Sequence, residues 1–507
     1  MEEQWGHQDL INMKWIDDFL NNITMYRLLL YFLIVLLVFG AVFGFLGLLP
    51  FSGISIIASS VFIVIVCWIS NTLFAKIFKA QTNLESVYIT ALILTLIFSP
   101  AKDLSGLILL FWVSVIAMAG KYILAINKKH IFNPAALSAV IISFTFNGAA
   151  SWWVGTGIML PIVVVGGILL VRKIKRADLV VSFLVTAIAV ITISGLTREL
   201  NPLTTIQKVI FETPILFFAF VMLTEPLTTP PTQPLQLIYG AIVGFIFSPE
   251  LHIAGIFSTP ELALVVGNIF SYIVSPKERL LLSLKKKIKL TPDTYQFTFN
   301  LDKNFKFKAG QYLEWTLGQK YPDARGTRRY FTIASSPTEK DIILGIKFYE
   351  NSSSYKREML KMETGNTITA GNLAGDFTMP SDLNKKLVFI AGGIGVTPYR
   401  SMIKYLIDAN EKRDVIFIYS EKNVNEMVYK DIFDEAKEKL GIKVVYFETD
   451  KNGHITSELF KKEVEDYKER TFYISGSHGM VTAFEETLKE MDMPTSQIKI
   501  DYFPGYA

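Results

Sequence analysis

Apolar segments fill most of the first 275 residues of this 507-residue chain, and they constrain its fold more than any other feature. They lie near 27–49, 52–74, 85–99, 104–124, 133–147, 153–171, 178–195, 210–223, 235–248 and 260–274. A helix needs about 20 residues to cross about 30 Å of hydrocarbon, and several of these segments reach that length. The sequence therefore predicts a polytopic α-helical membrane domain of about ten spans over residues 26–274.

The rest of the chain has a different composition. The chain as a whole is 51% hydrophobic, but beyond residue 275 lysine and glutamate become frequent. A net charge of +4, without a basic patch that carries interleaved aromatic residues, gives no sign of nucleic-acid binding. The single cysteine, Cys67, excludes a disulfide within the chain and an iron–sulfur cluster held by about four ligands. No other residue set predicts a metal site. Residues 1–25 are expected to form an interfacial helix or a disordered tail.

Basic residues between the apolar segments predict the orientation of the chain. They gather in alternate loops, at 76–79, at 128–129, at 172–176 and at 277–279 after the last span. Loops rich in lysine and arginine stay in the cytoplasm. We therefore expect a multi-pass protein of the cell's inner or plasma membrane, with both termini in the cytoplasm.

Two pairs of segments interrupt the pattern of full-length spans. The segments at 85–100 and 212–226 have about 15 residues, so each reaches roughly 22 Å, and they end in IFSP and MLTEP. Two segments later, FNPAAL (132–137) and STPELAL (258–264) each start a helix with proline in its first turn. These matches predict two inverted repeats of five spans, unless they arise by coincidence in apolar, proline-bearing sequence. Broken segments at matching positions of two repeats point to a ligand site.

Four polar residues at these breaks form the predicted membrane site, namely Asn133, Thr224, Glu225 and Thr228. An acid and an amide at membrane depth are costly to bury and usually have a function. The alternative is that Asn133 only caps a helix and that Glu225 is an exposed loop residue.

The motifs FNPAAL and FFAFVMLTEPLTTPPT (217–232) resemble the membrane flavin subunit of sodium-pumping NADH:quinone reductases and of Rnf electron-transport complexes, the NqrB/RnfD family. The resemblance covers residues 25–275 and implies bound flavin and electron transfer linked to the membrane. Members of that family carry a threonine that bears covalent FMN, but here Ala149 or Ala150 stands at that place. We therefore expect a second, non-covalent flavin (FMN or riboflavin) or a quinone near Asn133 and Glu225.

The last part of the chain alternates apolar strands with helices, which predicts an α/β nucleotide-binding domain over 384–507 with a parallel, doubly wound sheet. Its first strand runs into AGGIGVTPYR (391–400). A strand, a glycine turn and a helix N-terminus together seat a pyrophosphate, because the backbone can approach closely and free N–H groups point at the anion. The predicted NAD(P) contacts in this turn are Gly392, Gly393, Gly395, Thr397 and Pro398. Alternating strands over 285–383 predict an antiparallel β-barrel, joined to the membrane domain by a linker at 275–284.

The barrel sequence RYFTIASSP (329–337) resembles the R-x-Y-[ST]-x-x-S signature of the ferredoxin–NADP reductase superfamily. The resemblance implies that Arg329 pairs with the FAD diphosphate, that Phe331 lies against the isoalloxazine and that Thr332 reaches N5. Neighbouring motifs extend the predicted FAD site to Gln311, Tyr312, Ser335, Lys347, Ser353, Ser354, Gly375, Phe377 and the C-terminal Tyr506.

The nicotinamide side is predicted from a second motif. The sequence YISGSHGM (473–480) resembles the Y-x-C-G-P-x-x-M of the same superfamily, with Ser475 in place of cysteine. It implies that Gly476 and Met480 contact the coenzyme. The C-terminal sequence DYFPGY (501–506) resembles the aromatic tail that lies over the flavin in that superfamily. The two resemblances imply that Thr332, Ser475 and Phe503 line the reaction site. Serine offers no polarizable sulfur, so hydride transfer is expected to be slower. Ser420, Glu421 and Lys422 lie where the 2′-position of the coenzyme is expected. Glu421 favours a free ribose hydroxyl and Lys422 favours a phosphate, so the choice between NADH and NADPH stays open.

These features together predict a membrane-bound FAD-dependent NAD(P)H dehydrogenase. It would pass electrons from cytoplasmic NAD(P)H to a membrane flavin or quinone, or to another acceptor, across the membrane or with ion movement. A homodimer or a downstream electron carrier is open as a partner. A haem-bearing transmembrane reductase is excluded, because none of the five histidines lies in the middle of a span. A transporter of a small solute, flavin or ion, driven or regulated by the reductase, is the alternative.

Overall fold

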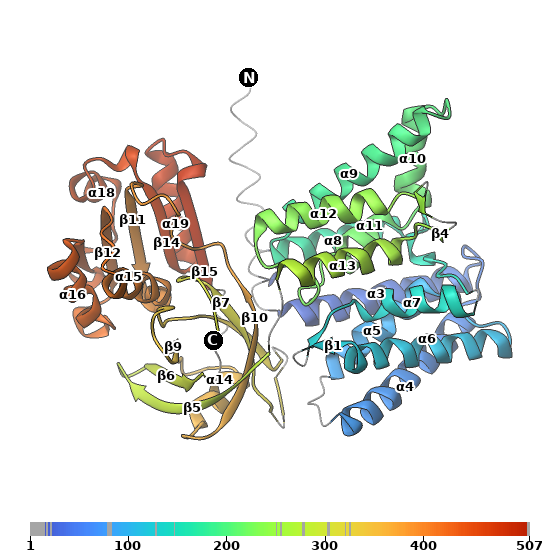
Figure 1. The fold of residues 1–507 in the computed structure, drawn as a ribbon, viewed down its shortest axis with the longest axis horizontal. Coiled ribbons are helices and arrows are strands. Elements are labelled where there is room, and N and C mark those ends of the chain that lie inside the picture. The colour runs from blue at the N-terminus through green and yellow to red at the C-terminus, as the bar shows by residue number, and fades with distance from the viewer. Residues whose placement is uncertain are drawn as a thin grey trace. The chain divides into compact units, whose positions relative to one another are not determined.

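The computed structural model divides the chain into two compact units, Met1–Arg279 and Leu280–Ala507 (Figure 1). It describes residues 16, 19, 20, 23–78, 84–126, 129–146, 148–249, 251–253, 256–275, 279–301, 305–319, 321–323 and 326–503. The first unit is helical and the second consists of two sheets with helices, as the sequence predicts.

The helical unit contains long apolar helices and several short ones. Its helices are α3 Met25–Phe45, α4 Gly53–Ile77, α5 Leu84–Ile97, α6 Leu104–Ile123, α7 Pro134–Thr145, α8 Leu160–Ile174, α9 Ala177–Leu196, α10 Pro202–Glu212, α11 Ile215–Phe217 with the π-helical turn η2 Phe218–Met222, α12 Gln233–Ile246 and α13 Pro260–Val274. Two short hairpins, β1 Ala125–Ile126 with β2 Lys129–His130 and β3 His252–Ile253 with β4 Ile256–Phe257, precede α7 and α13. The turn η1 covers Trp153–Gly155.

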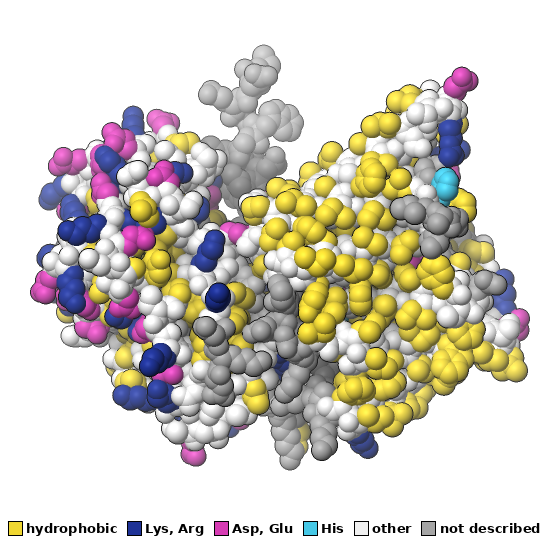
Figure 2. All heavy atoms as spheres, in the orientation of Figure 1, with side chains coloured by type: hydrophobic (Ala, Val, Ile, Leu, Met, Phe, Trp, Pro, Cys, Tyr) yellow, Lys and Arg dark blue, Asp and Glu magenta, His cyan; other side chains and the backbone are white. Residues whose placement is uncertain are grey.

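Four described helices are long and apolar enough to cross a membrane, namely α3, α4, α6 and α9. A fifth crossing is formed if α10 and the segment Ile215–Met222, which are bent by 64° relative to each other, make one span. The helices α5, α7, α12 and α13 are apolar but only 12 to 15 residues long. The expected ten or so spans are thus confirmed only in part, because prolines and caps start or end the short helices early. Many apolar side chains of this unit are exposed, Ile54 and Val185 among them. Figure 2 shows hydrophobic atoms, in yellow, over much of the visible face of this unit.

The helices α9 and α12 pack closely against each other. A Cβ atom at Gly240 would lie 2.8 Å from the Leu179 carbonyl oxygen, and one at Gly244 would lie 2.6 Å from the Phe183 carbonyl oxygen. Because these glycines are four residues apart on α12, they let the two backbones meet along one face. The two halves of the unit also share a sequence of elements, since α6 and α12 are each followed by a hairpin and then by a helix with proline in its first turn.

Gly244→Val is expected to lower the thermal stability of the detergent-solubilised protein, because two methyl groups would be forced into the Phe183 backbone. Overpacking of this kind costs about 1–3 kcal/mol. Gly157→Ala is the control, since its Cβ would meet only the Phe211 carbonyl oxygen at 3.5 Å. Equal melting temperatures for the two variants would contradict the close approach of α9 and α12.

The second unit contains a six-stranded antiparallel sheet in the order β8-β7-β10-β5-β6-β9. Its elements are β5 Leu280–Lys289, β6 Thr294–Asn300, β7 Tyr312–Thr316, β8 Arg328–Thr332, β9 Ile342–Lys347, α14 Ser354–Lys361 and β10 Thr367–Ala374. The backbone N–H of Ala334, just after β8, donates to the carbonyl of Ile343 on β9 at 2.8 Å, so the two outer strands are joined at this point. The strand β5 begins at Leu280, inside the expected linker.

The same unit continues as a five-stranded parallel sheet in the order β13-β12-β11-β14-β15. Its elements are β11 Leu387–Gly392, η3 Gly393–Val396, α15 Thr397–Ala409, β12 Val415–Glu421, η4 Val424–Glu426, α16 Lys430–Leu440, β13 Lys443–Glu448, α17 Thr449–Asn452, α18 Ser457–Glu463, η5 Tyr467–Glu469, β14 Thr471–Ser477, α19 His478–Glu490, η6 Thr495–Gln497 and β15 Ile498–Phe503. Every residue of β11 is buried, which is typical of a central parallel strand covered on both faces. The predicted doubly wound sheet is confirmed, with β15 as a fifth strand.

Candidate cofactor sites

The strand β8 carries two side chains of the predicted FAD site, Arg329 near its amino end and Thr332 at its carboxyl end. Thr332 is buried, and its hydroxyl has no hydrogen-bond partner among the described residues. The Arg329 guanidinium lies 5.1 Å from the ring centre of Tyr355 and donates to the Arg328 carbonyl at 2.7 Å. A buried hydroxyl without a partner costs about 1–3 kcal/mol, which a hydrogen bond to a ligand would recover.

The strand β7 and the turn before it lie next to Thr332. Tyr312 is the register partner of Thr332, and the Gln311 amide donates to the Gly375 carbonyl at 3.4 Å. Gly310 and Gly375 have φ angles of +95° and +116°, which glycine adopts without strain. The structure therefore brings together Gln311, Tyr312, Gly375 and Thr332, as the motifs predict.

Other residues of the predicted FAD site already have protein partners. The Ser335 hydroxyl accepts from the Ile343 N–H at 3.1 Å, Ser353 caps α14, and Ser354 exchanges hydrogen bonds with Asp323. The Phe377 side chain packs against Tyr473, with ring centres 5.2 Å apart. Contact of these four residues with FAD stays a prediction.

Lys347 lies among carboxylates at the end of β9. Its amine is 3.3 Å from Asp293 and 3.6 Å from Glu426. Burial acts to lower the pKa of this amine, but the charges of Glu421, Asp293 and Glu426 outweigh it and raise the pKa above its ordinary value. Lys347 is therefore protonated and ion-paired, and its predicted contact with a phosphate would compete with these acids.

The glycine turn after β11 allows a close approach of backbones. Gly393 has a φ of +59°, and a Cβ at Gly395 would collide with the Ser475 carbonyl oxygen on β14. The helix α15 begins at Thr397, whose N–H donates to the Ile394 carbonyl, and Pro398 has no N–H. An anion at this helix start would therefore be held by the remaining N–H groups of the turn. A Cβ at Gly392 would collide with the Met480 sulfur, so Met480 lies directly over the turn.

The carboxyl end of β14 forms the predicted nicotinamide side. The Ser475 side chain is fully buried, and its hydroxyl has no hydrogen-bond partner within the described part of the chain. In the β14–β15 register, Ser475 pairs with Asp501 and Gly476 with Tyr502. Sequence reasoning missed Asp501, although it directly precedes the aromatic tail. The backbone of Phe503 lies beside β14, whereas Tyr506 lies outside the described residues.

The adenosine side of the sheet carries acidic residues. Glu421 at the end of β12, one residue after Ser420, is the register partner of Glu448 at the end of β13. Burial raises the pKa of the Glu421 carboxyl, which lies 3.6 Å from the position of a Cβ at Gly393. Lys422 follows the strand and is exposed.

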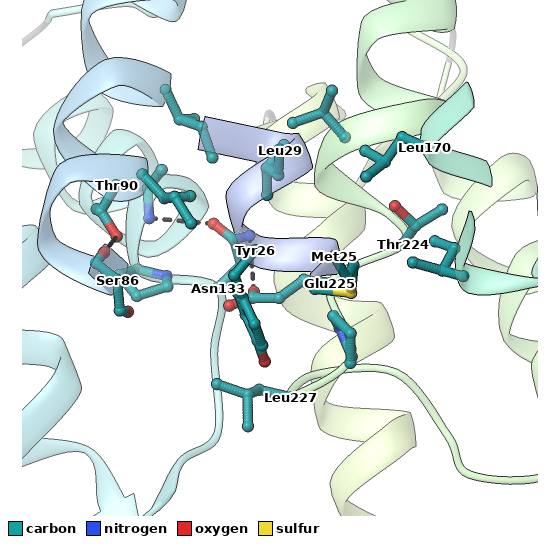
Figure 3. A pocket seen from close by; sticks show the side chains of 17 residues that line it. Met25, Tyr26, Leu29, Ser86, Thr90, Asn133, Leu170, Thr224, Glu225 and Leu227 are labelled. Atoms are coloured by element: carbon teal, nitrogen blue, oxygen red, sulfur yellow. Dashed lines mark hydrogen bonds between the residues drawn. The ribbon is translucent and has the colours of Figure 1, made fainter. Parts of the chain in front are cut away.

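The predicted membrane residues lie together in the helical unit (Figure 3). The Asn133 side-chain amide donates to a Glu225 oxygen at 2.9 Å, and the Thr228 hydroxyl donates to the same oxygen at 3.2 Å. His130 is 3.7 Å from the other Glu225 oxygen, and the Asn133 backbone N–H donates to Asn268 at 2.8 Å. The sequence analysis did not identify His130 and Asn268 as part of this site, because both are far from Glu225 in the sequence.

Asn133 has both roles that the sequence left open. Its side-chain oxygen accepts from the Ala135 and Ala136 N–H groups at 3.1 Å and caps α7, while its amide holds Glu225. The hydroxyl of Thr224 bonds back to the Phe220 carbonyl at 2.7 Å.

A cavity of about 50 Å³ borders this cluster. Its polar lining residues are Tyr26, Ser86, Thr90, Asn133, Thr224 and Glu225, and its apolar lining includes Met25, Leu29 and Leu227 (Figure 3). The Met25 side chain in the lining is flexible, so it can move at low cost to fit a ligand.

The residues in the second unit fit FAD and a dinucleotide. The turn glycines let the backbone pack closely against Met480 and β14, and the two buried hydroxyls of Thr332 and Ser475 lack partners where ring atoms are expected. Among the described residues no group of three or more histidine, cysteine, aspartate or glutamate side chains could hold a metal ion.

Two family models match the chain. Residues 154–275 match the NQR2, RnfD, RnfE family, and residues 389–486 match the oxidoreductase NAD-binding domain. Curated relatives include the flavohemoprotein of Bacillus subtilis, 26% identical over 210 residues, which make up 39% of this chain and 52% of that protein. The human oxidoreductase NAD-binding domain-containing protein 1 is 27% identical over 234 residues, 39% of this chain and 70% of that protein. The chain spans about half the length of the first of these relatives.

Similar solved structures include a flavohemoglobin from Malassezia yamatoensis with bound FAD and heme, with a TM-score of 0.42 and 20% identity over 59% of this chain and 74% of that one. A ferredoxin–NADP+ reductase from Plasmodium falciparum has a TM-score of 0.39 and 20% identity over 45% of this chain and 97% of that one. The two family matches confirm both resemblances that the motifs predict, so this chain joins an NqrB/RnfD-like membrane segment to a reductase-like nucleotide-binding module.

Proposed function

We propose that this protein is a membrane-bound, FAD-dependent NAD(P)H oxidoreductase that passes electrons to a flavin or quinone in its helical unit. The observation that carries the proposal is the pair of buried hydroxyls without partners, on Thr332 and Ser475, at the ends of two strands that belong to the two sheets of the reductase unit. The family matches on both sides of residue 279 support the same combination.

In this proposal each side chain has a separate task. Bound FAD supplies a two-electron acceptor that can release electrons one at a time. Arg329 neutralises the diphosphate, Thr332 donates a hydrogen bond to the flavin ring, and the first turn of α15 holds the pyrophosphate of the coenzyme. Asp501 adds a negative charge beside Ser475, which favours the positive ring that remains after a hydride leaves the nicotinamide.

Thr332→Val is expected to lower the rate of flavin reduction by NAD(P)H tenfold or more while FAD stays bound, because only the hydroxyl is removed. Arg329→Ala is expected to release FAD instead, since the diphosphate loses its charge partner. Stopped-flow absorbance and FAD content distinguish these effects. The control is Thr369→Val, a buried threonine of the same sheet whose hydroxyl bonds to the Thr316 carbonyl. A normal rate in Thr332→Val would show that the ring lies elsewhere.

The acidic edge of the sheet favours NADH as the coenzyme. In a doubly wound sheet, a carboxylate at the end of the second strand accepts hydrogen bonds from a free ribose diol, and Glu421 is at that position. A 2′-phosphate would meet the negative charges of Glu421 and its register partner Glu448. Lys347, the nearest cation to Glu421, is already paired with other acids.

Wild-type protein is expected to show kcat/KM for NADH at least tenfold above that for NADPH, a difference of about 1.4 kcal/mol. Glu421→Gln should lower the ratio of kcat/KM for NADH to kcat/KM for NADPH, because it removes the repulsion between Glu421 and the 2′-phosphate and so improves the use of NADPH. Glu435→Gln, an acidic residue of α16 paired with Lys439, should leave the ratio unchanged. A preference for NADPH in the wild-type protein would refute this assignment.

For the helical unit we propose an inverted repeat of five spans with the ligand beside Glu225. The support is the shared order of helix, hairpin and proline-started helix in each half. Asn133, Thr224, Glu225 and Thr228 would contact a non-covalent flavin or a quinone, and an external acceptor, a second copy of the chain or an electron carrier would take the electrons on. The positive-inside pattern supports cytoplasmic termini in an inner or plasma membrane.

Glu225→Leu is expected to lower reduction of quinone at least tenfold while reduction of soluble dyes at the flavin stays within about twofold of normal. Asn133 is left unchanged in this variant, because it also caps α7. The control is Glu212→Leu, which removes an exposed glutamate at the end of α10. Equal losses of dye and quinone activity would indicate misfolding, and loss of neither would remove Glu225 from the electron path.

A transporter of a small solute, flavin or ion is the second candidate, because the cavity lies where broken helices meet. Flux of a solute, flavin or ion into vesicles in the absence of NAD(P)H would support transport that does not depend on the reductase. Flux that requires NAD(P)H would support ion movement linked to electron transfer.

A further inference from the structure

The helix α15 contacts both candidate sites of the reductase unit. It begins directly after the glycine turn that faces the coenzyme, and its next turn faces the antiparallel sheet that carries Thr332. The helix α15 and the antiparallel sheet pack closely against each other. A Cβ at Gly345 on β9 would lie 2.7 Å from the Tyr429 hydroxyl and 3.0 Å from the Thr397 methyl group.

Arg400 makes the central contact of this interface. Its guanidinium donates to the Ala334 carbonyl at 2.8 Å and to both oxygens of Glu339, at 2.5 Å and 3.0 Å. Arg400 is only 6% exposed, and its guanidinium lies 5.4 Å from the ring centre of Tyr429. A bidentate pair of this kind fixes orientation as well as distance.

The contacts of Arg400 converge on the short segment 334–336. The Glu339 carboxylate also accepts from the Ser336 N–H at 2.6 Å, and the hydroxyl of Ser401, the next residue on α15, donates to the Ser335 carbonyl at 2.6 Å. This segment starts two residues after Thr332. On the other side, Arg400 is three residues from Thr397, where the coenzyme-facing helix begins. One side chain therefore connects the flavin-facing strand end to the pyrophosphate-facing helix start.

The ion pair between Arg400 and Glu339 is better explained by a role in positioning than by a role in stability. Burying two charges costs nearly as much as their attraction returns, and apolar replacements of buried pairs are often neutral in stability. Hydride transfer, in contrast, needs the reacting atoms about 3–3.5 Å apart, and a misplacement of about 1 Å can cost about 100-fold in rate.

We propose that Arg400, held by Glu339, is a positioning residue that sets the approach of the nicotinamide to the flavin. This inference rests on the proposed function. Arg400 touches neither ring. It acts by fixing the segment that carries Thr332 relative to the helix that seats the coenzyme.

The test is anaerobic stopped-flow reduction of the flavin in the full-length, detergent-solubilised protein, with whichever of NADH and NADPH reduces the wild-type protein faster. Arg400→Met is expected to lower the limiting rate 10- to 100-fold. FAD content and the coenzyme concentration for half-maximal rate should stay within about threefold of wild type, because no group that contacts either ligand is removed. Arg400→Lys should recover part of the rate, since lysine restores the charge but not the bidentate geometry.

Arg470→Met is the matched control. Arg470 is 5% exposed and is paired with Asp414 and Asp466, but it lies at the amino end of β14, at the opposite edge of the sheet from the coenzyme turn. Its loss should lower stability and leave the limiting rate within about twofold. Glu339→Gln should give an intermediate rate, and the double variant with Arg400→Met should be no slower than Arg400→Met alone.

A normal limiting rate in Arg400→Met would overturn the inference, as would loss of FAD or a large rise in the half-maximal coenzyme concentration at an unchanged limiting rate. An equal fall in Arg470→Met would also overturn it, since the effect would then be general destabilisation. If wild-type protein holds FAD but neither coenzyme reduces it, the proposed function itself fails.

Discussion

The cost of burying polar groups controls both candidate sites, and it is met in different ways. In the helical unit, one Glu225 oxygen accepts hydrogen bonds from Asn133 and Thr228, so this oxygen is satisfied within the protein beside a cavity. In the reductase unit, the hydroxyls of Thr332 and Ser475 are buried without partners among the described residues. The Glu225 oxygen needs no ligand, whereas the two hydroxyls would be satisfied by one.

Local sequence patterns predicted what depends on neighbours along the chain. The strand β11, the glycine turn and α15 follow from an apolar run, from backbone needs that only glycine meets and from proline in a first turn. The strand β15 was not predicted, and its last residues were interpreted as part of an aromatic tail. Asn133 and Glu225 were predicted to share one site and do meet across 92 residues, but other contacts over long sequence separations were not predicted. Asn268 lies 135 residues from Asn133, and Glu339 lies 61 residues from Arg400, although Arg400 itself stands in the most recognisable motif.

In the proposed function, a single chain for both units would change the kinetics of electron delivery. The helix α13 ends at Val274 and β5 begins at Leu280, so only a few residues connect them. A short tether makes an encounter intramolecular, with an effective concentration in the millimolar range. The proposed electron transfer would therefore not depend on the abundance of a diffusing carrier.

Serine at position 475 increases the importance of geometry in this reductase. A thiol beside the reacting carbon would add polarizability, and the Ser475 hydroxyl cannot replace it. In the proposed function, the remaining contributions to the rate would be orientation and fixed charge, from Thr332, from Asp501 in register with Ser475, and from the ion pair that joins the two sheets. Because orientation contributes only while the two sheets keep their relative position, a buried arginine at their interface is placed where a small displacement has its largest effect on the rate.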